Sequence, residues 1–219
     1  MNRKIVFAPD EFYHIYNRGN DKREIFLNKK DYRRFICLLY LCNSYRPLHF
    51  RDILKGAEFL FDQDETLVDI GCFCLMPNHF HILVKEKDDG NLPLFMQKIA
   101  TGYSMYFNLK QQRTGKLFEG AFKATHADSD EYLKYLFAYI HLNPVKLIEP
   151  LWKETGIKNL SQAEVFLKNY QPSSYLDFQE TKREEAKILN LKDFPEYFSD
   201  KKDFNDYIND WLNYREFTD

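Results

Sequence analysis

The stretch Cys72-Phe73-Cys74-Leu75-Met76-Pro77-Asn78-His79-Phe80-His81-Ile82-Leu83-Val84-Lys85 has one apolar run on each side of Met76-Pro77-Asn78. Because side chains alternate between the two faces of an extended strand, His79 and His81 share one face. The other face is apolar, which predicts that it is buried; it carries Phe80, Ile82 and Val84. The two runs therefore predict an antiparallel hairpin with two histidines side by side on one strand.

Two interpretations of this histidine pair are open. Two imidazoles on a rigid strand can offer two nitrogen ligands to a divalent metal ion. Alternatively, one is a hydrogen-bonded structural histidine and the other a surface residue. The strand alone does not decide between them.

The sequence before the hairpin predicts a strand and a helix. Residues 12–18 alternate and are rich in aromatic side chains, as is typical of a strand. From about Asn28 to Tyr40 the apolar residues recur at spacings of three and four, which predicts a helix. Residues 49–66 are mixed and predict an irregular segment or a short helical insertion. The hairpin strands are expected at 67–75 and 79–85.

The sequence after the hairpin predicts a second helix ending near Lys110, a weakly alternating fourth strand over 117–125, and a third helix ending at Asn143-Pro144. The order strand, helix, strand, strand, helix, strand is that of the ferredoxin-like split βαβ unit. The predicted fold class is thus α+β, with an antiparallel sheet, helices on one face and a helical C-terminal extension. A terminal helix is expected over 204–214.

The distribution of charge suggests two parts of the chain. Residues 177–219 hold 7 Lys and Arg against 12 Asp and Glu, within a chain whose net charge is -2. The extension is thus acidic and residues 1–176 are mildly basic, which permits binding of DNA by that part. We therefore expect a mildly basic domain over 1–176 and an acidic, helical extension over 177–219.

Composition excludes several classes of protein. With 44% hydrophobic residues in 219, the chain can form a core and is not wholly disordered. No apolar run approaches the roughly 20 residues of a membrane-spanning helix. The amino-terminal residues have too short an apolar core for a signal peptide, so we expect a cytoplasmic protein. The four cysteines lie in apolar contexts and are expected to be small buried side chains: Cys37, Cys42, Cys72 and Cys74.

The third helix supplies a possible second half of the site. Tyr139 and Asn143 are separated by four residues and so lie on one helical face. If that face looks onto the histidine pair, Asn143 can give a metal ion an oxygen ligand and Tyr139 can point at a phosphate. Two nitrogens and one amide oxygen leave positions open, which suits loosely bound Mg²⁺ or Mn²⁺. Such an ion would make attack on a phosphate by the weakly nucleophilic phenol feasible.

Each residue also has a structural interpretation. Asn143 precedes Pro144 and can simply end the helix. Tyr139 lies on an apolar stripe and can be a core residue, since the chain has 15 tyrosines. The case for a site depends on their combination with His79 and His81.

These residues resemble a known family. Met76-Pro77-Asn78-His79-Phe80-His81 resembles the HUH motif (His, hydrophobic, His) of single-tyrosine transposases, in the IS200-like superfamily. Tyr139-Ile140-His141-Leu142-Asn143-Pro144-Val145-Lys146 resembles their nucleophile helix, especially in the REP-associated tyrosine transposase branch. Three further stretches are similar to other segments of the family: Tyr13-His14-Ile15-Tyr16-Asn17-Arg18-Gly19-Asn20, Gly115-Lys116-Leu117-Phe118-Glu119-Gly120-Ala121-Phe122-Lys123 and Gln171-Pro172-Ser173-Ser174-Tyr175. The resemblance spans about residues 12–176, and the acidic extension is not part of it.

The resemblance implies that residues 1–176 form a transposase and nuclease domain. Its activity would be that of a metal-dependent endonuclease and transposase acting on single-stranded DNA, often beside a REP-like hairpin. Tyr139 would be the nucleophile, forming a 5'-phosphotyrosine link that is later resolved by strand transfer. His79, His81 and Asn143 would hold the metal ion. Monomeric and homodimeric arrangements are both compatible with the sequence.

Several cations are candidates for contact with DNA phosphates: Arg18, Lys22, Arg23, Lys110, Arg113, Lys116 and Lys123. Aromatic residues interleave with the later ones, a combination that suits single-stranded DNA. Those aromatics can equally be core residues. His14, His126 and His141 are expected to be structural.

Three functions therefore compete. The first is an active transposase, which needs Tyr139 as well as the histidine pair. The second is a catalytically silent relative that only binds hairpin DNA or RNA. The third is an unrelated metal-dependent hydrolase in which Tyr139 is a core residue and no covalent adduct forms.

Overall fold

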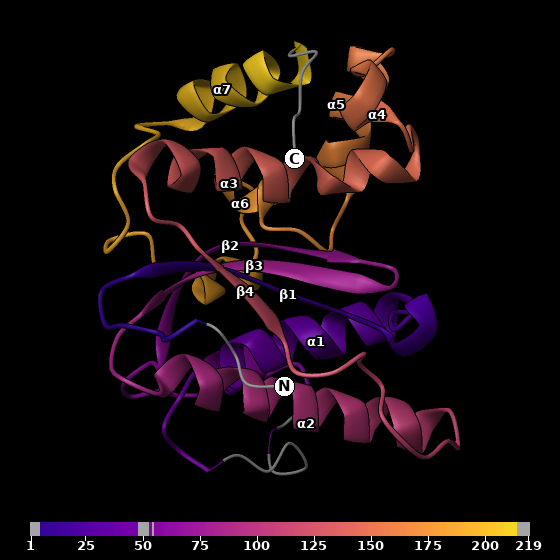
Figure 1. The fold of residues 1–219 in the computed structure, drawn as a ribbon, viewed down its shortest axis with the longest axis vertical. Helices are drawn as coiled ribbons and strands as arrows, with labels where there is room; N and C mark the ends of the chain where they lie inside the picture. Colours follow the sequence, from indigo (N-terminus) through magenta and orange to yellow (C-terminus); the bar gives the residue numbers. More distant parts are fainter. Residues whose placement is uncertain (1–4, 48–52, 54, 214–219) are drawn as a thin grey trace.

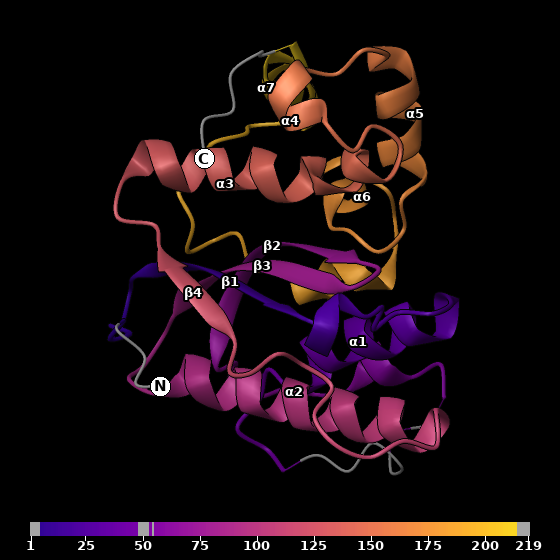
Figure 2. The ribbon, with the colours of Figure 1, turned by 45° about the vertical axis from the view of Figure 1, so that its right-hand side comes forward.

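The computed structural model describes residues 5–47, 53 and 55–213 of the chain. Part of the segment over 49–66 lies outside these residues; its remainder contains a short 3-10 helix, η3 (Glu58–Leu60). Among the described residues, no helix combines the length and the apolar character needed to cross a membrane. Figures 1 and 2 show a central sheet between two helical layers.

The sheet has four strands in the order β2-β3-β1-β4. Their bounds are β1 (Phe12–Arg18), β2 (Val68–Met76), β3 (His79–Glu86) and β4 (Lys123–His126). All neighbouring pairs are antiparallel. Because β1 and β2 are joined by a helix and β3 lies between them, this is the split βαβ arrangement, and the predicted ferredoxin-like α+β fold is confirmed.

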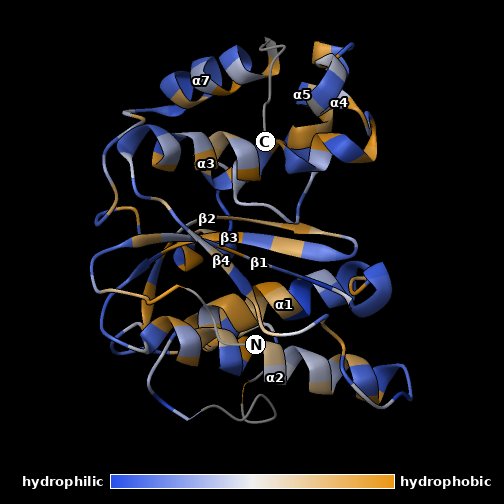
Figure 3. Cartoon of the chain, viewed as in Figure 1, coloured by the Kyte–Doolittle hydropathy of each residue, from blue (hydrophilic) through white to orange (hydrophobic). Residues whose placement is uncertain are grey.

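Two crossover helices cover one face of the sheet, α1 (Lys29–Leu41) and α2 (Asn91–Lys110). The first begins where the sequence predicts, because the Asn28 side chain accepts a hydrogen bond from the backbone N–H of Lys30. Figure 3 shows a long hydrophobic stretch on α1. The largest apolar cluster joins this layer to one face of the strands, including Phe80, Ile82 and Val84.

A third helix, α3 (Asp130–Leu142), lies across the opposite face of the sheet. It begins after Ser129, whose side chain accepts from the backbone N–H of Tyr132. Its apolar residues pack against Cys72, Cys74 and Leu83. The expectation of helices on one face holds for the two crossover helices only. Leu83 shares the histidine face of β3 and is fully buried, so that face also needs a covering layer.

The fourth strand is shorter than predicted. A strand was expected over 117–125, but β4 covers only Lys123–His126. In the preceding segment the Asn17 side-chain amide donates to the carbonyl oxygen of Gly120 at 3.1 Å. The backbone of this segment still pairs with the chain at the end of β1, through an isolated bridge between Gly19 and Phe118, but the ladder is interrupted at Gly120 and a regular strand begins only at Lys123.

The C-terminal part is helical and packs on α3. After η4 (Asn143–Leu147) come the elements α4 (Trp152–Thr155), α5 (Leu160–Asn169), α6 (Tyr175–Phe178), η5 (Glu184–Ile188) and α7 (Lys201–Asn213). Most of α7 is coloured hydrophilic in Figure 3, whereas its Phe204, Ile208 and Leu212 are buried in one cluster with Ala138 and Leu142 of α3. Tyr214, the expected end of the terminal helix, lies outside the described residues.

A serine-rich segment ties α3 to the sheet. The backbone N–H of Leu75 donates to the carbonyl oxygen of Pro172, and that of Phe73 donates to the Ser174 hydroxyl at 2.9 Å. The same hydroxyl lies 2.7 Å from Nε2 of His141, which is fully buried. His141 therefore connects α3 to β2 through the Ser174 hydroxyl and has a structural position, as the sequence predicts.

Candidate active site

The hairpin turn fixes the start of β3 and thereby His79. β2 ends at Met76 and β3 begins at His79, so Pro77 and Asn78 form a two-residue connection. The carbonyl oxygen of Pro77 accepts from the backbone N–H groups of Ile25 and Phe26. Nδ1 of His79 lies 2.6 Å from Oδ1 of Asn78. Because an amide oxygen only accepts, His79 donates from Nδ1, and Nε2 carries its lone pair.

His81 has a partner that sequence analysis missed. Its Nδ1 lies 2.8 Å from Nε2 of His14, and both side chains are buried. The contact exists because Tyr16 is directly opposite His81 in the β1–β3 register, which places His14 on the same face one step along the strand. The alternation of residues 12–18 predicts that His14 and Tyr16 share a face of the strand. It does not predict which residue of β3 lies opposite them, because that register is set only when the two strands pair.

The third helix places Tyr139 over the histidines. Its ring centroid lies 5.6 Å from that of His81 and 5.7 Å from that of His14, in edge-to-face geometry. Four residues later, Asn143 is buried and its Nδ2 donates to the carbonyl oxygen of Tyr139 at 3.0 Å. Because that hydrogen bond is made by the amide nitrogen, the amide oxygen is the atom with which Asn143 could coordinate a metal ion.

These four side chains line one pocket of about 290 Å³. It lies between the hairpin, the end of β1 and the C-terminal end of α3. Its lining residues are Tyr16, Asn17, Arg18, Asn78, His79, His81, Glu119, Lys123, Tyr139, Asn143 and Lys146.

The pocket is electropositive. Arg18, Lys123 and Lys146 contribute three cations to its wall, against the single carboxylate of Glu119. Arg18 forms a two-pronged ion pair with that carboxylate, at 2.8 and 3.1 Å. A phosphate group is attracted to such a wall because guanidinium and ammonium groups neutralise its charge. Sequence analysis omitted Lys146 from the candidate cations, although it ends the motif that begins at Tyr139.

Burial keeps His79 in the form that can bind metal. It lowers the pKa of His79 to about 4, and the positive charges of Lys146 and Arg18 act in the same direction. The imidazole is therefore neutral near neutral pH, which a metal ligand must be.

The donor set fits a divalent ion that keeps open positions. The other ring nitrogen of each histidine is engaged, by Asn78 in one case and His14 in the other, and this is the usual way in which metal-binding imidazoles are oriented. The described residues contain no cluster of three or more His, Cys, Asp or Glu that could hold a metal ion. The candidate set instead combines His79, His81 and the amide oxygen of Asn143.

The other candidate cations divide into two groups. Lys22 and Arg23 follow β1 close to the pocket. The carbonyl oxygen of Lys22 accepts from Nδ2 of Asn78, and Nε of Arg23 donates to the carbonyl oxygen of Asn20. Lys110, by contrast, belongs to α2 on the other face of the sheet and is 2.5 Å from the buried carboxylate of Asp31. The loop after α2 carries the remaining two, Arg113 and Lys116.

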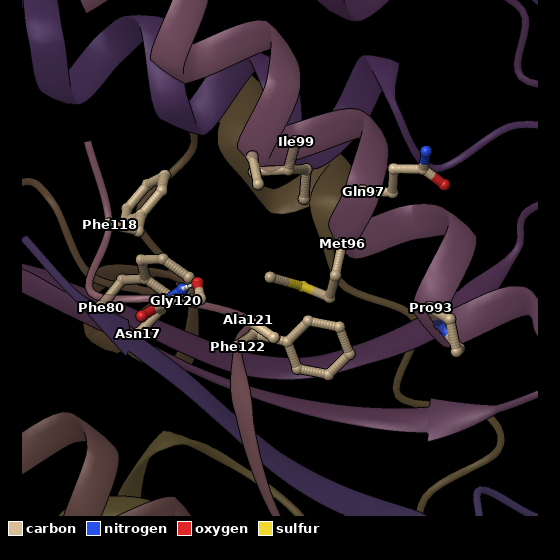
Figure 4. Close-up of a pocket in the computed structure, with 11 residues that line it drawn as sticks. Asn17, Phe80, Pro93, Met96, Gln97, Ile99, Phe118, Gly120, Ala121 and Phe122 are labelled. Carbon is tan, nitrogen blue, oxygen red and sulfur yellow. Dashed lines mark hydrogen bonds between the residues drawn. The ribbon is translucent and has the colours of Figure 1, made fainter. Parts of the chain in front are cut away.

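The aromatic residues that interleave with these cations are mostly core residues. Tyr103, Phe107, Phe118 and Phe122 are all buried. Two of them close a small cavity of about 210 Å³ between the sheet and α2, shown in Figure 4. Phe118, Phe122 and Met96 face one another across it in Figure 4. Tyr139 belongs to α3, which covers the opposite face of the sheet from α2.

Comparison with known proteins supports the resemblance. Residues 56–143 match the model of a family described as transposase IS200 like. The match includes the hairpin and α3, and so contains His79, His81, Tyr139 and Asn143. No curated protein matches the sequence.

A solved structure has a similar fold. It is described as the structure of a REP-associated tyrosine transposase bound to a REP hairpin, and it matches with a TM-score of 0.53 and 12% sequence identity. The match covers 84% of this chain and 90% of that chain. At this identity the likeness concerns the fold.

Proposed function

We propose that this chain, whose residues 56–143 match the IS200-like transposases, is a metal-dependent transposase that cleaves and rejoins single-stranded DNA through a 5'-phosphotyrosine. The observation that carries the proposal is the shared pocket. Tyr139 opens into the same space as His79, His81 and Asn143, beside three cations. A tyrosine with only a packing role would be surrounded by apolar side chains and would not face histidines, an amide and cations.

Tyr139 is the proposed nucleophile. Its phenolic oxygen forms a bond to the phosphorus and gives up its proton, while the bond from phosphorus to the 3'-oxygen of the preceding nucleotide breaks. That oxygen leaves as a 3'-hydroxyl after taking up a proton. The phosphodiester is conserved as a tyrosyl ester, so a later 3'-hydroxyl can attack it and rejoin the strands without added energy.

His79, His81 and Asn143 are the residues that would hold Mg²⁺ or Mn²⁺. When bound, such an ion polarises the phosphate and offsets its negative charge. The residues themselves supply orientation: Asn78 and His14 fix the two rings, and the α3 backbone fixes the amide.

The proposed substrate is single-stranded DNA beside a hairpin. The similar solved structure is bound to a REP hairpin, and we extend that partner class to this chain as part of the proposal. Arg18, Lys123 and Lys146 lie where they could contact phosphates next to the scissile one. Lys22 and Arg23 would extend the contact, whereas Lys110, Arg113 and Lys116 could reach only a more distant part of the DNA. We expect a cytoplasmic monomer or homodimer.

An adduct assay tests this function. Wild type, Tyr139→Phe and His81→Ala proteins are mixed with labelled hairpin DNA from the flanks of the gene, with Mg²⁺ or Mn²⁺, and separated on denaturing gels. We expect label that migrates with wild-type protein only and disappears after chelation. Tyr16→Phe is the matched control, because Tyr16 lines the same pocket and should keep the adduct.

Two results would overturn the proposal in different ways. Cleavage without an adduct that survives Tyr139→Phe would indicate a plain metal-dependent hydrolase. Tight hairpin binding with neither cleavage nor adduct, over several flanking sequences and both metals, would indicate the catalytically silent relative.

A further inference from the structure

A second cavity lies beside the first, on the other side of Tyr139. Its volume is about 550 Å³. It is lined by His14, Tyr16, His81, Thr125, Tyr132, Tyr135, Leu136 and Tyr139. Tyr16, His81 and Tyr139 belong to both cavities, so the two spaces meet at the proposed nucleophile.

Three tyrosines of α3 form one wall of this second cavity. Tyr132, Tyr135 and Tyr139 are spaced by three and four residues and so share one helical face. The rings of Tyr132 and Tyr135 are 6.0 Å apart at 24°, and those of Tyr135 and Tyr139 are 5.8 Å apart. All three side chains are half-buried, unlike Leu136 and Phe137 beside them, which are buried.

The two cavities differ in charge. The lining of the second contains no Lys, Arg, Asp or Glu among the described residues, whereas the first contains Arg18, Lys123 and Lys146. A DNA strand likewise has a charged part and an aromatic part: its phosphates carry negative charge, and its bases are flat aromatic rings. Phosphates are held by cations, and unpaired bases are held by stacking on aromatic side chains.

We propose that the aromatic cavity binds one unpaired nucleobase immediately next to the scissile phosphate, stacked on Tyr132 and Tyr135. The inference rests on the proposed function for the position of the phosphate. With the phosphate in the cationic pocket, the adjoining base has the aromatic cavity beside it, because both spaces share the Tyr139 ring. Tyr132 and Tyr135 are then substrate-positioning residues that explain why the substrate must be unpaired at this point.

Base stacking can be measured without catalysis. The probes are hairpins with a single-stranded extension in which one base is replaced by 2-aminopurine, moved along the extension position by position. All proteins carry Tyr139→Phe, so that no cleavage occurs. We expect quenching of the probe at one position, lost in Tyr132→Leu and Tyr135→Leu and retained in Tyr132→Phe and Tyr135→Phe, which keep the ring.

The affinity should change in the same pattern. Stacking of one base on an aromatic side chain predicts a roughly tenfold to hundredfold weaker binding of the extension in the Leu variants. The Phe variants should bind like the parent protein. Thermal unfolding identifies any Leu variant that fails to fold; since Tyr135 also contacts Trp211 at 5.0 Å, Tyr132 gives the cleaner test.

The outcomes separate this inference from the proposed function. Quenching that is unchanged in folded Leu variants, or equal at every probe position, would overturn the base-binding cavity even if wild type forms the adduct. Position-specific quenching that depends on the tyrosine rings would support the cavity, even if the adduct assay fails and the catalytic function has to be withdrawn.

Discussion

Successive residues of β3 point to opposite faces of the sheet, and the two faces have different roles. The side chains of Phe80, Ile82 and Val84 belong to the largest apolar cluster, between the sheet and the layer of α1 and α2. His79 and His81 point toward α3 and the electropositive pocket. A single strand thus supplies the core of the protein on one side and its candidate chemistry on the other.

The difference shows what burial requires of each face. Apolar side chains are stabilised by burial alone, at about 25 cal/mol per Å² removed from water. A buried imidazole is stable only if its polar atoms are paired. On the histidine face, Asn78 and His14 supply these partners and in doing so fix the two rings. The hydrogen bonds that make burial of these imidazoles possible therefore also orient them toward the pocket.

The largest expected effect separates the two faces by function. His81→Ala should reduce formation of the DNA adduct by about 10³-fold or more, because even residues that only orient metal ligands are worth about 10- to 100-fold. The free energy of unfolding should fall by about 1–3 kcal/mol, less than for Phe80, because the substitution removes the hydrogen bond between His81 and the buried His14. The yield of adduct in the presence of metal and the thermal unfolding of the protein measure the two quantities. If the variant formed the adduct normally, His81 would not be a functional residue of the site.

The neighbouring residue should behave in the opposite way. Phe80→Ala removes a fully buried ring from the apolar face and should lower the free energy of unfolding by about 3–5 kcal/mol. Denaturant unfolding measures this cost. Phe80→Leu is the matched control and should lose considerably less. If Phe80→Ala and His81→Ala destabilise the protein equally, the division between the faces is wrong.

His14 tests the orientation of the histidine face. His14→Ala should weaken Mn²⁺ binding by about 10- to 100-fold, because it removes the partner that fixes the His81 ring. Calorimetric titration with Mn²⁺ measures the affinity. His126→Ala is the control, since His126 pairs with Glu11 away from the pocket. Equal Mn²⁺ affinity in both variants would contradict the role of His14.

The smallest expected effect concerns the acidic group at the end of the apolar face. Glu86 is fully buried, and its carboxylate accepts from the backbone N–H of Leu92 at 2.9 Å. Burial raises its pKa to about 7, although backbone hydrogen bonds act in the other direction. The folded protein therefore binds this proton more tightly than the unfolded chain.

The sign of the pH dependence follows. The contribution of Glu86 is complete below its ordinary pKa near 4.5 and is lost as the pH rises through about 7. Glu86→Gln should consequently be more stable than wild type near pH 8, by an amount on the order of 1–2 kcal/mol, with little difference near pH 4. Unfolding of both proteins over this pH range measures the difference, and a gap that widens toward low pH would contradict it.

Local patterns predicted most of the fold. The alternation over 79–85 and the three-and-four spacing in the helices gave the correct strands and helices, since periodicity depends only on which side of each element is buried. The same periodicity placed Tyr139 and Asn143 on one face. The start of α1 could be predicted because Asn28 caps it, and Ser129 caps the start of α3 in the same way.

The features that could not be predicted lie where distant segments meet. The hydrogen bond between His14 and His81 depends on strand register, and the hydrogen bond from the Asn17 side chain to the carbonyl oxygen of Gly120 lies where the ladder before β4 is interrupted. Likewise, the pairing of Lys110 with Asp31 joins residues far apart in the sequence. None of these contacts leaves a periodic signal, because each is made by side chains that only the folded chain brings together.

The most direct test of the account identifies the residue that becomes linked to DNA. Wild-type protein is incubated with flanking hairpin DNA and Mn²⁺, digested with nuclease and protease, and the peptides are analysed by mass spectrometry. The account predicts a nucleotide attached through a 5'-phosphate to Tyr139, with Tyr16, Tyr132 and Tyr135 unmodified although they line the adjoining cavities. A nucleotide on one of those three, or cleaved DNA with no modified tyrosine, would contradict it.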